Sequence, residues 1–317
     1  MPETPERKPR FKRVAVEDIQ ITERDVEIVR QVAKHRFLRS THITALVPGS
    51  AQTTIRRLQL LYHHQILDRP REQIDYYNPI GSKAIVYGLG NKGADLLAER
   101  MEYLRGKINW AAKNKSVGPV FLEHTLLTAD FMVALEVACR EHGRVRLIDA
   151  QEILANAPES TRKRPNPTGL SVTVDDLDQR RHTLGVIPDQ MFGLQYLDKP
   201  EGRNIGYFFL EADRATMPVM RSNLRQTSFY RKLVTYYATW ETGLHTKLFN
   251  FKNFRVLTVT SSPARVTSLI EANKALAKGT GSRLFLFTDE ASLKKAGNPL
   301  TLEWRSGKEG EPTRLVE

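Results

Sequence analysis

One stretch, IGYFFLEADR from Ile205 to Arg214, constrains the fold of this chain more than any other. A short apolar and aromatic run of this kind predicts a buried β-strand. The run ends in Glu211 and Asp213, and side chains two residues apart in a strand point to the same face of the sheet. The sequence therefore predicts a strand that delivers two carboxylates to one place.

The segments around this strand predict an α/β (α+β) domain. Residues 120–142 predict a long amphipathic helix, and RVRLIDA predicts a strand after it. LSVTV and RHTLGVIPDQMFGL predict a hairpin whose second strand contains Pro188-Asp189. Beyond IGYFFLEADR, the predicted order is a helix in SNLRQTSFYRKLVTYYATW, a strand in FRVLTVTSS, a helix in ARVTSLIEANKALA and a strand in RLFLFTD.

Helix, three strands, helix and strand in this order resemble the core of the PD-(D/E)XK nuclease superfamily, a mixed sheet flanked by helices. Pro188-Asp189 and Glu211 fall where that superfamily has its paired acids. The resemblance implies that Asp189, Glu211 and Asp213 bind Mg²⁺ or Mn²⁺, since hard cations take carboxylate oxygens and can activate water against a phosphate. The alternative is that each acid ends a strand in solvent, with Asp213 pairing with Arg214.

This chain departs from the superfamily pattern at one position. Where Glu-x-Lys is expected, it has Glu211-Ala212-Asp213, so the strand lysine is missing. Lys232 on the following helix is the predicted replacement as a catalytic residue, and Arg214 and Arg231 are weaker candidates. A lysine on a helix face can equally be a solvated surface residue.

The resemblance also implies a contribution from the first helix of the nuclease-like domain. Some members of the superfamily add an acid or a histidine there, and Glu123 and His124 are the corresponding metal-ligand candidates. The alternative is that Glu123 simply interacts with the dipole at the helix N-terminus.

The first third of the chain is strongly basic. Between Ile28 and Leu67 there is no Asp or Glu, and the formal net charge of the whole chain is +12. Basic surfaces of this kind favour a polyanionic partner, because binding releases the counterions condensed on phosphates. Double-stranded DNA is the predicted partner.

The same region predicts a winged helix-turn-helix. TERD at residues 22–25 is typical of a capping box, and three short helices follow, separated near His35 and at Pro48-Gly49. ILDRP and AIVYGLG then predict a hairpin. In the third helix Ile55 and Leu58 are expected to face inward. The predicted DNA-binding residues, on the outer face and in the wing, are Arg39, Gln52, Thr53, Arg56, Arg57 and Lys83. The alternative is a small helical domain with a solvated basic face.

These patterns predict four segments. They are a basic flexible tail (1–18), a winged helix-turn-helix (19–115), a nuclease-like domain (116–292) and a C-terminal tail (293–317), with KNKSVGP at residues 113–119 as the linker.

The whole chain resembles the replication-relaxation family of plasmid and mobile-element proteins. The resemblance lies in TERDVEIV, LEHTLLTADF, PDQMFGL, FFLEADRAT and YRKLVTYY, and it covers about residues 20 to 290. It implies a DNA-directed function in replication, relaxation or transfer, with a metal-dependent DNA-nicking nuclease as the first hypothesis. The alternative is a nuclease fold without catalysis that serves as a DNA-binding regulator or replication accessory protein. A homodimer or other replication and transfer proteins are the further expected partners.

Several function classes are disfavoured by the sequence. No apolar run is long enough to cross a bilayer, so we expect an unexported, cytoplasmic protein. Cys139 is the only cysteine, which excludes an intrachain disulfide and a thiolate zinc cluster. The chain has no phosphate-binding loop of the Walker type. The pairs Tyr76-Tyr77 and Tyr236-Tyr237 allow a tyrosine nucleophile, but there is no His-x-His to bind its metal.

Overall fold

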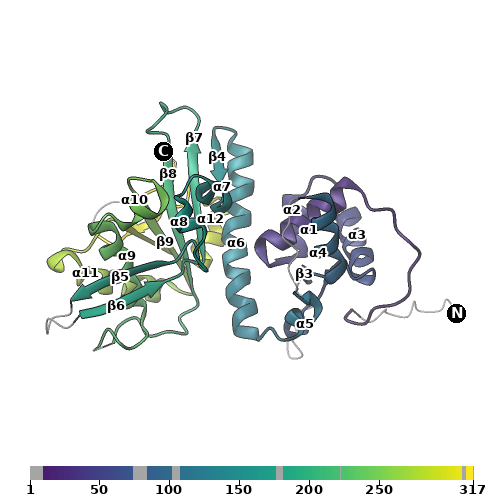
Figure 1. Ribbon diagram of the computed structural model, residues 1–317, viewed down its shortest axis with the longest axis horizontal. Helices are drawn as coiled ribbons and strands as arrows, with labels where there is room; N and C mark the ends of the chain where they lie inside the picture. The colour runs from purple at the N-terminus through teal and green to yellow at the C-terminus, as the bar shows by residue number, and fades with distance from the viewer. Residues whose placement is uncertain are drawn as a thin grey trace. The chain divides into compact units, whose positions relative to one another are not determined.

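A computed structural model of the chain describes residues 10–73, 84–101, 108–175, 181–221, 223–308 and 312–316. The fold is α/β, with helices and sheets in both parts of the chain (Figure 1). It divides into two compact units, Met1–Val133 and Ala134–Glu317. The division falls within one long helix, α6 (Pro119–His142), instead of in the predicted linker. Each unit is described separately below.

The first unit begins with the predicted capping box. The hydroxyl of Thr22 accepts a hydrogen bond from the backbone N–H of Asp25, and the Asp25 carboxylate accepts from the backbone N–H of Thr22 at 2.8 Å. This reciprocal pair satisfies two backbone donors that a helix start leaves free. The elements of this unit ahead of α6 are α1 (Glu23–His35), β1 (Phe37–Arg39), α2 (Ser40–Leu46), α3 (Ala51–His63), β2 (Leu67–Asp68), β3 (Val86–Leu89), α4 (Asn91–Arg100) and α5 (Trp110–Lys115).

Among the described residues of this unit, three short strands form an antiparallel sheet in the order β1-β3-β2. The hairpin of β2 and β3 was predicted, but β1 was not. Only three residues form β1, directly between two helices, which is too short for a periodic pattern to show. The order helix, strand, two helices and two strands is compatible with a winged helix-turn-helix, which remains a prediction.

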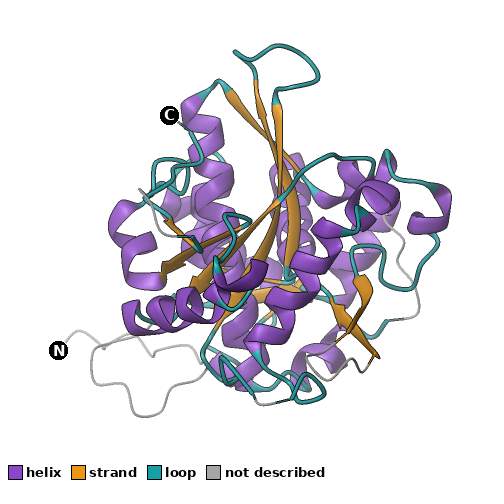
Figure 2. Cartoon of the chain, turned by 90° about the vertical axis from the view of Figure 1, so that its left-hand side faces the viewer, coloured by secondary structure: helices purple, strands orange, loops and turns teal. Residues whose placement is uncertain are grey.

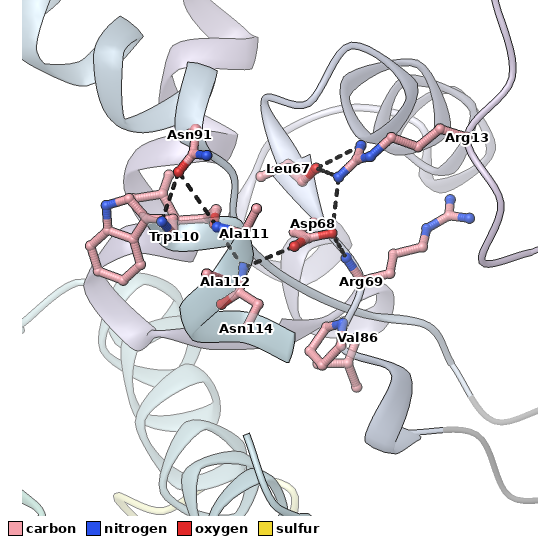
Figure 3. A network of polar contacts seen from close by, with 12 residues as sticks. Arg13, Leu67, Asp68, Arg69, Val86, Asn91, Trp110, Ala111, Ala112 and Asn114 are labelled. Atoms are coloured by element: carbon pink, nitrogen blue, oxygen red, sulfur yellow. Dashed lines mark hydrogen bonds and ion pairs between the residues drawn. The ribbon is translucent and has the colours of Figure 1, made fainter. Parts of the chain in front are cut away.

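A polar network ties α5 to the base of the hairpin (Figure 3). The Asp68 carboxylate accepts from Arg13 at 2.9 Å and from the side-chain amide of Asn114 at 3.3 Å. The side-chain oxygen of Asn91, at the start of α4, accepts from the backbone N–H of Trp110 at 2.7 Å. These bonds make α5 part of the first unit, so the linker prediction for residues 113–119 is wrong at both ends: α5 extends to Lys115 and α6 starts at Pro119.

The predicted long helix, α6, is confirmed. Its first half shares a small apolar core with the sheet of the first unit: Leu122 and Leu126 pack with Phe37, Val86 and Val117. The first unit therefore includes residues that were assigned from sequence to the nuclease-like domain.

In the described part of the second unit, six strands form one mixed sheet in the order β11-β10-β9-β8-β7-β4. Figure 2 shows the twist of its strands in orange. Strands β4, β7 and β8 are antiparallel neighbours, and β8, β9 and β10 are parallel. The strands are β4 (Val145–Ile148), β5 (Leu170–Asp175), β6 (Arg181–Val186), β7 (Gln190–Tyr196), β8 (Ile205–Asp213), β9 (Arg255–Thr260), β10 (Phe285–Asp289) and β11 (Arg305–Ser306). The helices after α6 are α7 (Ala150–Ala155), α8 (Glu159–Arg162), α9 (Phe229–Glu241), α10 (Leu244–Phe249), α11 (Pro263–Lys274) and α12 (Glu290–Ala296).

The core of this unit lies between the sheet and helices α9 and α11. Phe209 of β8 packs with Leu233 and Tyr236 of α9, and Leu269 of α11 and Phe285 of β10 belong to the same buried cluster. The hairpin of β5 and β6 is a separate sheet that packs on α9. The prediction that Pro188 and Asp189 lie inside a hairpin strand is therefore wrong, because both residues lie between β6 and β7.

The C-terminal segment also differs from its prediction as a tail. Strand β11 pairs with β10, and Trp304 is fully buried. In the described part of this segment Glu303 and Arg305 are exposed, while Leu300, Leu302 and Trp304 are buried and hold it to the unit. No helix in the described ranges combines the length and apolar character needed to span a bilayer.

Candidate functional site

Strand register brings Asp189 and Glu211 together. Gln190 of β7 is the partner of Leu210 of β8, so one residue further along this antiparallel pair Asp189 comes opposite Glu211. Two hydrogen bonds hold Asp189 there: its N–H donates to the carbonyl of Leu210 at 3.1 Å, and its carboxylate accepts from the N–H of Ala212 at 2.7 Å. The two acids predicted as metal ligands are thus neighbours.

Helix α9 covers Glu211 with two donors. The Lys232 ammonium donates to one carboxylate oxygen of Glu211 at 2.5 Å, and the Tyr236 hydroxyl donates to the other at 2.5 Å. Lys232 and Tyr236 are four residues apart, which puts them on one face of the helix. Glu211 is 1% exposed, whereas Asp189 is half-buried and the Lys232 side chain is 27% exposed, so solvent reaches this cluster through its outer members.

Burial dominates the protonation of Glu211. Removal from water raises the pKa of Glu211 to about 7; the positive charge of Lys232 opposes this shift and the negative charge of Asp189 adds to it. Burial pulls the pKa of Lys232 down, but the charges of Glu211 and Asp189 outweigh it and raise that pKa above its ordinary value. Near neutral pH the cluster thus contains a carboxyl group able to gain or lose a proton beside a fixed ammonium.

Asp213 is committed to a different interaction. Its carboxylate accepts from the Arg265 guanidinium at 2.8 and 3.2 Å and from the Thr260 hydroxyl at 2.8 Å, and the side chain is 4% exposed. Arg265 also donates to the carbonyl of Met217 at 2.7 Å. Asp213 therefore joins β8 to α11 and β9, and Arg265, which was not predicted, is a salt-bridge partner of its carboxylate.

The donor set suits a small site for a hard cation. No group of three or more His, Cys, Asp or Glu side chains within the described ranges is arranged to hold a metal. Mg²⁺, however, commonly uses one or two carboxylates together with substrate phosphates and water. The half-buried Asp189 fits that minimal set, and Glu211 fits it if the ion displaces one of the two α9 donors from a carboxylate oxygen. The carboxylate of Asp213 is occupied as well, by Arg265 and Thr260.

The other two metal-ligand candidates lie in the first unit. Glu123 is exposed and His124 is half-buried, both in the first turns of α6. The described residues around them form no cluster of three or more potential ligands.

The outer face of α3 carries part of the predicted DNA-binding set. Gln52, Thr53 and Arg56 are exposed, as expected. Ile55 was predicted to face inward but is 44% exposed, and Thr54 is buried in its place. The exposed face of α3 therefore presents polar, cationic and apolar side chains together, which are the types that read base edges and thymine methyl groups.

Two arginines of that set have structural partners. Arg57 does not point outward as predicted: its guanidinium forms two bonds to the buried carboxylate of Asp25, at 2.7 and 2.6 Å. Arg39 and His42 both contact the carboxylate of Asp130 on α6. Lys83, the predicted wing contact, and the pair Tyr76-Tyr77 lie outside the described residues.

Comparison with known proteins identifies the family. The family model described as Replication-relaxation matches residues 29–250, well over half of the chain. The chain belongs to the Replication-relaxation family. No curated protein and no solved structure gives a significant match.

The matched region contains all the residues of the Asp189, Glu211 and Lys232 cluster in this Replication-relaxation protein. The roles of two nearby residues, Tyr236 and Arg265, were not predicted from the sequence. Tyr236 was considered as a nucleophile or a packing residue, yet its spacing from Lys232 places both on one helix face toward Glu211. No local sequence pattern identified Arg265, because its contact with Asp213 joins residues 52 positions apart.

Proposed function

We propose that this protein binds the DNA of a plasmid or mobile element and nicks it with a metal-dependent nuclease centre in its second unit. The observation that carries the proposal is the contact between the Lys232 ammonium and Glu211, beside Asp189. It supplies, from helix α9, the cation that the strand lacks. Membership of the Replication-relaxation family supports the DNA-directed role.

Asp189 and Glu211 would hold Mg²⁺ or Mn²⁺ in this centre. When bound, the ion would polarise the scissile phosphate and lower the pKa of a coordinated water. Lys232 would place a positive charge where negative charge develops on the phosphate oxygens. Because burial raises the pKa of Glu211 to about 7 in the metal-free protein, binding of the ion would require Glu211 to lose its proton and should strengthen as the pH rises toward about 8. Tyr236 would orient Glu211 and, being fully buried, would not attack the phosphate.

DNA binding would reside in the first unit. Helix α3 would enter the major groove with Gln52, Thr53 and Arg56, in the manner of a winged helix-turn-helix. Arg57 would act indirectly, because its bonds to Asp25 fix α3 against α1.

The rival function is a DNA-binding regulator or accessory protein whose nuclease-like centre is inactive. It is favoured by one observation: both oxygens of Glu211 already accept hydrogen bonds from Lys232 and Tyr236. In that case the cluster would only stabilise the packing of α9 on β8.

Incubation of the full-length protein with supercoiled plasmid and Mg²⁺ or Mn²⁺ separates the two functions. We expect open-circular product from the wild type, none with EDTA, and a loss of at least about 100-fold in Glu211→Gln and Lys232→Met, consistent with the loss of one electrostatic contact to the transition state. Glu241→Gln and Lys247→Met, which change exposed residues of α9 and α10, are the matched controls. Intact plasmid under all conditions, with duplex binding retained in a gel shift, would support the regulator.

A further inference from the structure

A wide groove lies at one end of the sheet of the second unit, and Glu211 lies toward the other end of this sheet. It is formed where β8 and β9 begin, by the last turn of α9 and by the segments before β10 and after β11, and its volume is about 1000 Å³. Phe208 and Arg255, partners in the parallel pair of β8 and β9, mark its floor. Neither the family match nor the proposed nuclease centre accounts for this groove, and several of its residues lie beyond position 250.

Aromatic rings line one part of the groove. Trp240 is 43% exposed, and its ring lies 5.9 Å from that of Tyr237. Tyr207 stacks on Phe251 behind it, with ring centroids 4.5 Å apart, so its position is fixed. Tyr196 is held by a hydrogen bond from its hydroxyl to the carbonyl of Leu315 at 2.7 Å. The three tyrosines are half-buried, and the Lys199 ammonium lies 4.6 Å from the centre of the Tyr196 ring, so Trp240 is the exposed ring of the set. Pre-positioned rings of this kind are surfaces on which unpaired bases stack.

Cationic side chains line the rest. Arg255, Arg283, Lys199 and Lys308 are exposed, and among the described residues that line the groove none is Asp or Glu. Two acids that contact lining residues are already bound: Glu303 pairs with Arg314 at 2.6 Å, and Glu241 bonds to Tyr237. The groove therefore combines a net positive charge with aromatic faces.

We propose that this groove binds an unpaired segment of nucleic acid. A single strand offers a phosphate backbone to the arginines and lysines and free base faces to Trp240 and the tyrosines. Duplex DNA keeps its base faces stacked inside, and an acidic peptide offers charge without flat rings, so neither uses both halves of the groove. The volume, at the upper end of the range for ligand pockets, accommodates more than one base.

Fluorescence anisotropy of full-length protein with fluorescein-labelled dT15, over a range of salt concentrations, tests the groove. For Arg255→Ala/Arg283→Ala we expect weaker binding and a salt slope reduced by about 1.4, since each phosphate contact to a single strand contributes about 0.7. The matched control Lys294→Ala/Lys295→Ala removes the same charge from exposed positions of α12, outside the groove, and should keep the wild-type slope.

Trp240 variants test stacking separately from charge. Trp240→Ala should weaken dT15 binding about tenfold, whereas Trp240→Phe, which keeps a ring, should stay within about threefold of the wild type. Both variants should bind a duplex of the same length like the wild type, which separates this site from duplex binding by α3. Thermal unfolding checks that each variant is folded.

Two results would overturn the proposal. One is equal dT15 affinity and salt slope in the Arg255→Ala/Arg283→Ala variant and its α12 control, together with no effect of Trp240→Ala. The other is displacement of dT15 by a decaglutamate peptide as effectively as by unlabelled dT15, which would make the groove a general polyanion surface. Both outcomes are independent of plasmid nicking.

Discussion

At the scale of single residues, Glu211 shows how burial controls the charge of the cluster. Its pKa, raised to about 7, exceeds the ordinary value of 4.5. Below pH 4.5 the side chain is protonated in the folded and unfolded states alike. Between 4.5 and 7 only the unfolded state releases the proton, so rising pH favours unfolding in this window.

The stability of the second unit should therefore fall from pH 5 to pH 8, by at most about 3 kcal/mol from this group. Urea unfolding at several pH values would measure it. In Glu211→Gln this contribution to the decrease in unfolding free energy should be missing, so the variant should lose less stability than the wild type between pH 5 and pH 8. Glu241→Gln should lose as much as the wild type. Parallel curves for the wild type and Glu211→Gln would contradict the raised pKa of Glu211.

Tyr236 and Tyr237 should respond differently to loss of their hydroxyl groups. Tyr236 is fully buried and donates to Glu211, so Tyr236→Phe leaves a buried carboxylate oxygen without its donor. The expected cost is about 1 to 3 kcal/mol of unfolding free energy, with a further rise in the pKa of Glu211. Tyr237→Phe, at a half-buried neighbour, should cost less than about 1 kcal/mol. Equal losses measured by urea unfolding would remove the special role of the Tyr236 hydroxyl.

At the scale of elements, the pair of Asp25 and Arg57 joins α1 to α3. Asp25 is 1% exposed, and it also caps α1. Asp25→Ala removes the carboxylate partner of Arg57, which keeps its bond to a backbone carbonyl ahead of α1, and it removes the half of the capping box that the Asp25 side chain forms. We therefore expect a loss of about 3 kcal/mol. Glu27→Ala breaks the more exposed pair with Arg30 and a hydrogen bond from the Gln31 amide, and it should cost less than Asp25→Ala, about 1 kcal/mol. Denaturation followed by circular dichroism would compare them, and similar losses would mean that the buried pair contributes nothing beyond a surface pair.

Sequence periodicity predicted the long helix and strands β4, β8, β9 and β10, because these depend on local patterns. The resemblance to the PD-(D/E)XK superfamily implied that Asp189 and Glu211 lie together, and strand register makes them neighbours. Periodicity joined β6 and β7 into one strand and missed β11. It did not predict β1, which is too short for a pattern, or the outward position of Ile55, since one apolar residue fits either face of a helix. Arg265 and the inward pairing of Arg57 depend on contacts between distant segments. These contacts decide which charged residues are available for function and which are structural.

At the scale of the whole molecule, the net charge of +12 is distributed over surfaces with different chemistry. The first unit presents Arg56 beside Gln52 and Thr53 on a helix, a combination suited to the edges of paired bases. The groove of the second unit presents exposed arginines beside aromatic faces, a combination suited to unpaired bases. One chain would thus engage both duplex and single-stranded DNA, the two forms present when a nick is made and a strand is displaced.

Arg56→Ala should separate these two activities. It removes an exposed phosphate or base contact on α3, so we expect weaker binding of a plasmid-derived duplex and a salt slope reduced by about 0.9. Binding of dT15 should not change, because Arg56 is not part of the groove. Lys34→Ala, which removes one exposed charge from α1, is the control and should leave the duplex slope at its wild-type value. If Arg56→Ala and Lys34→Ala reduce duplex binding equally, the first unit attracts DNA through its overall charge, and α3 does not act as a recognition helix.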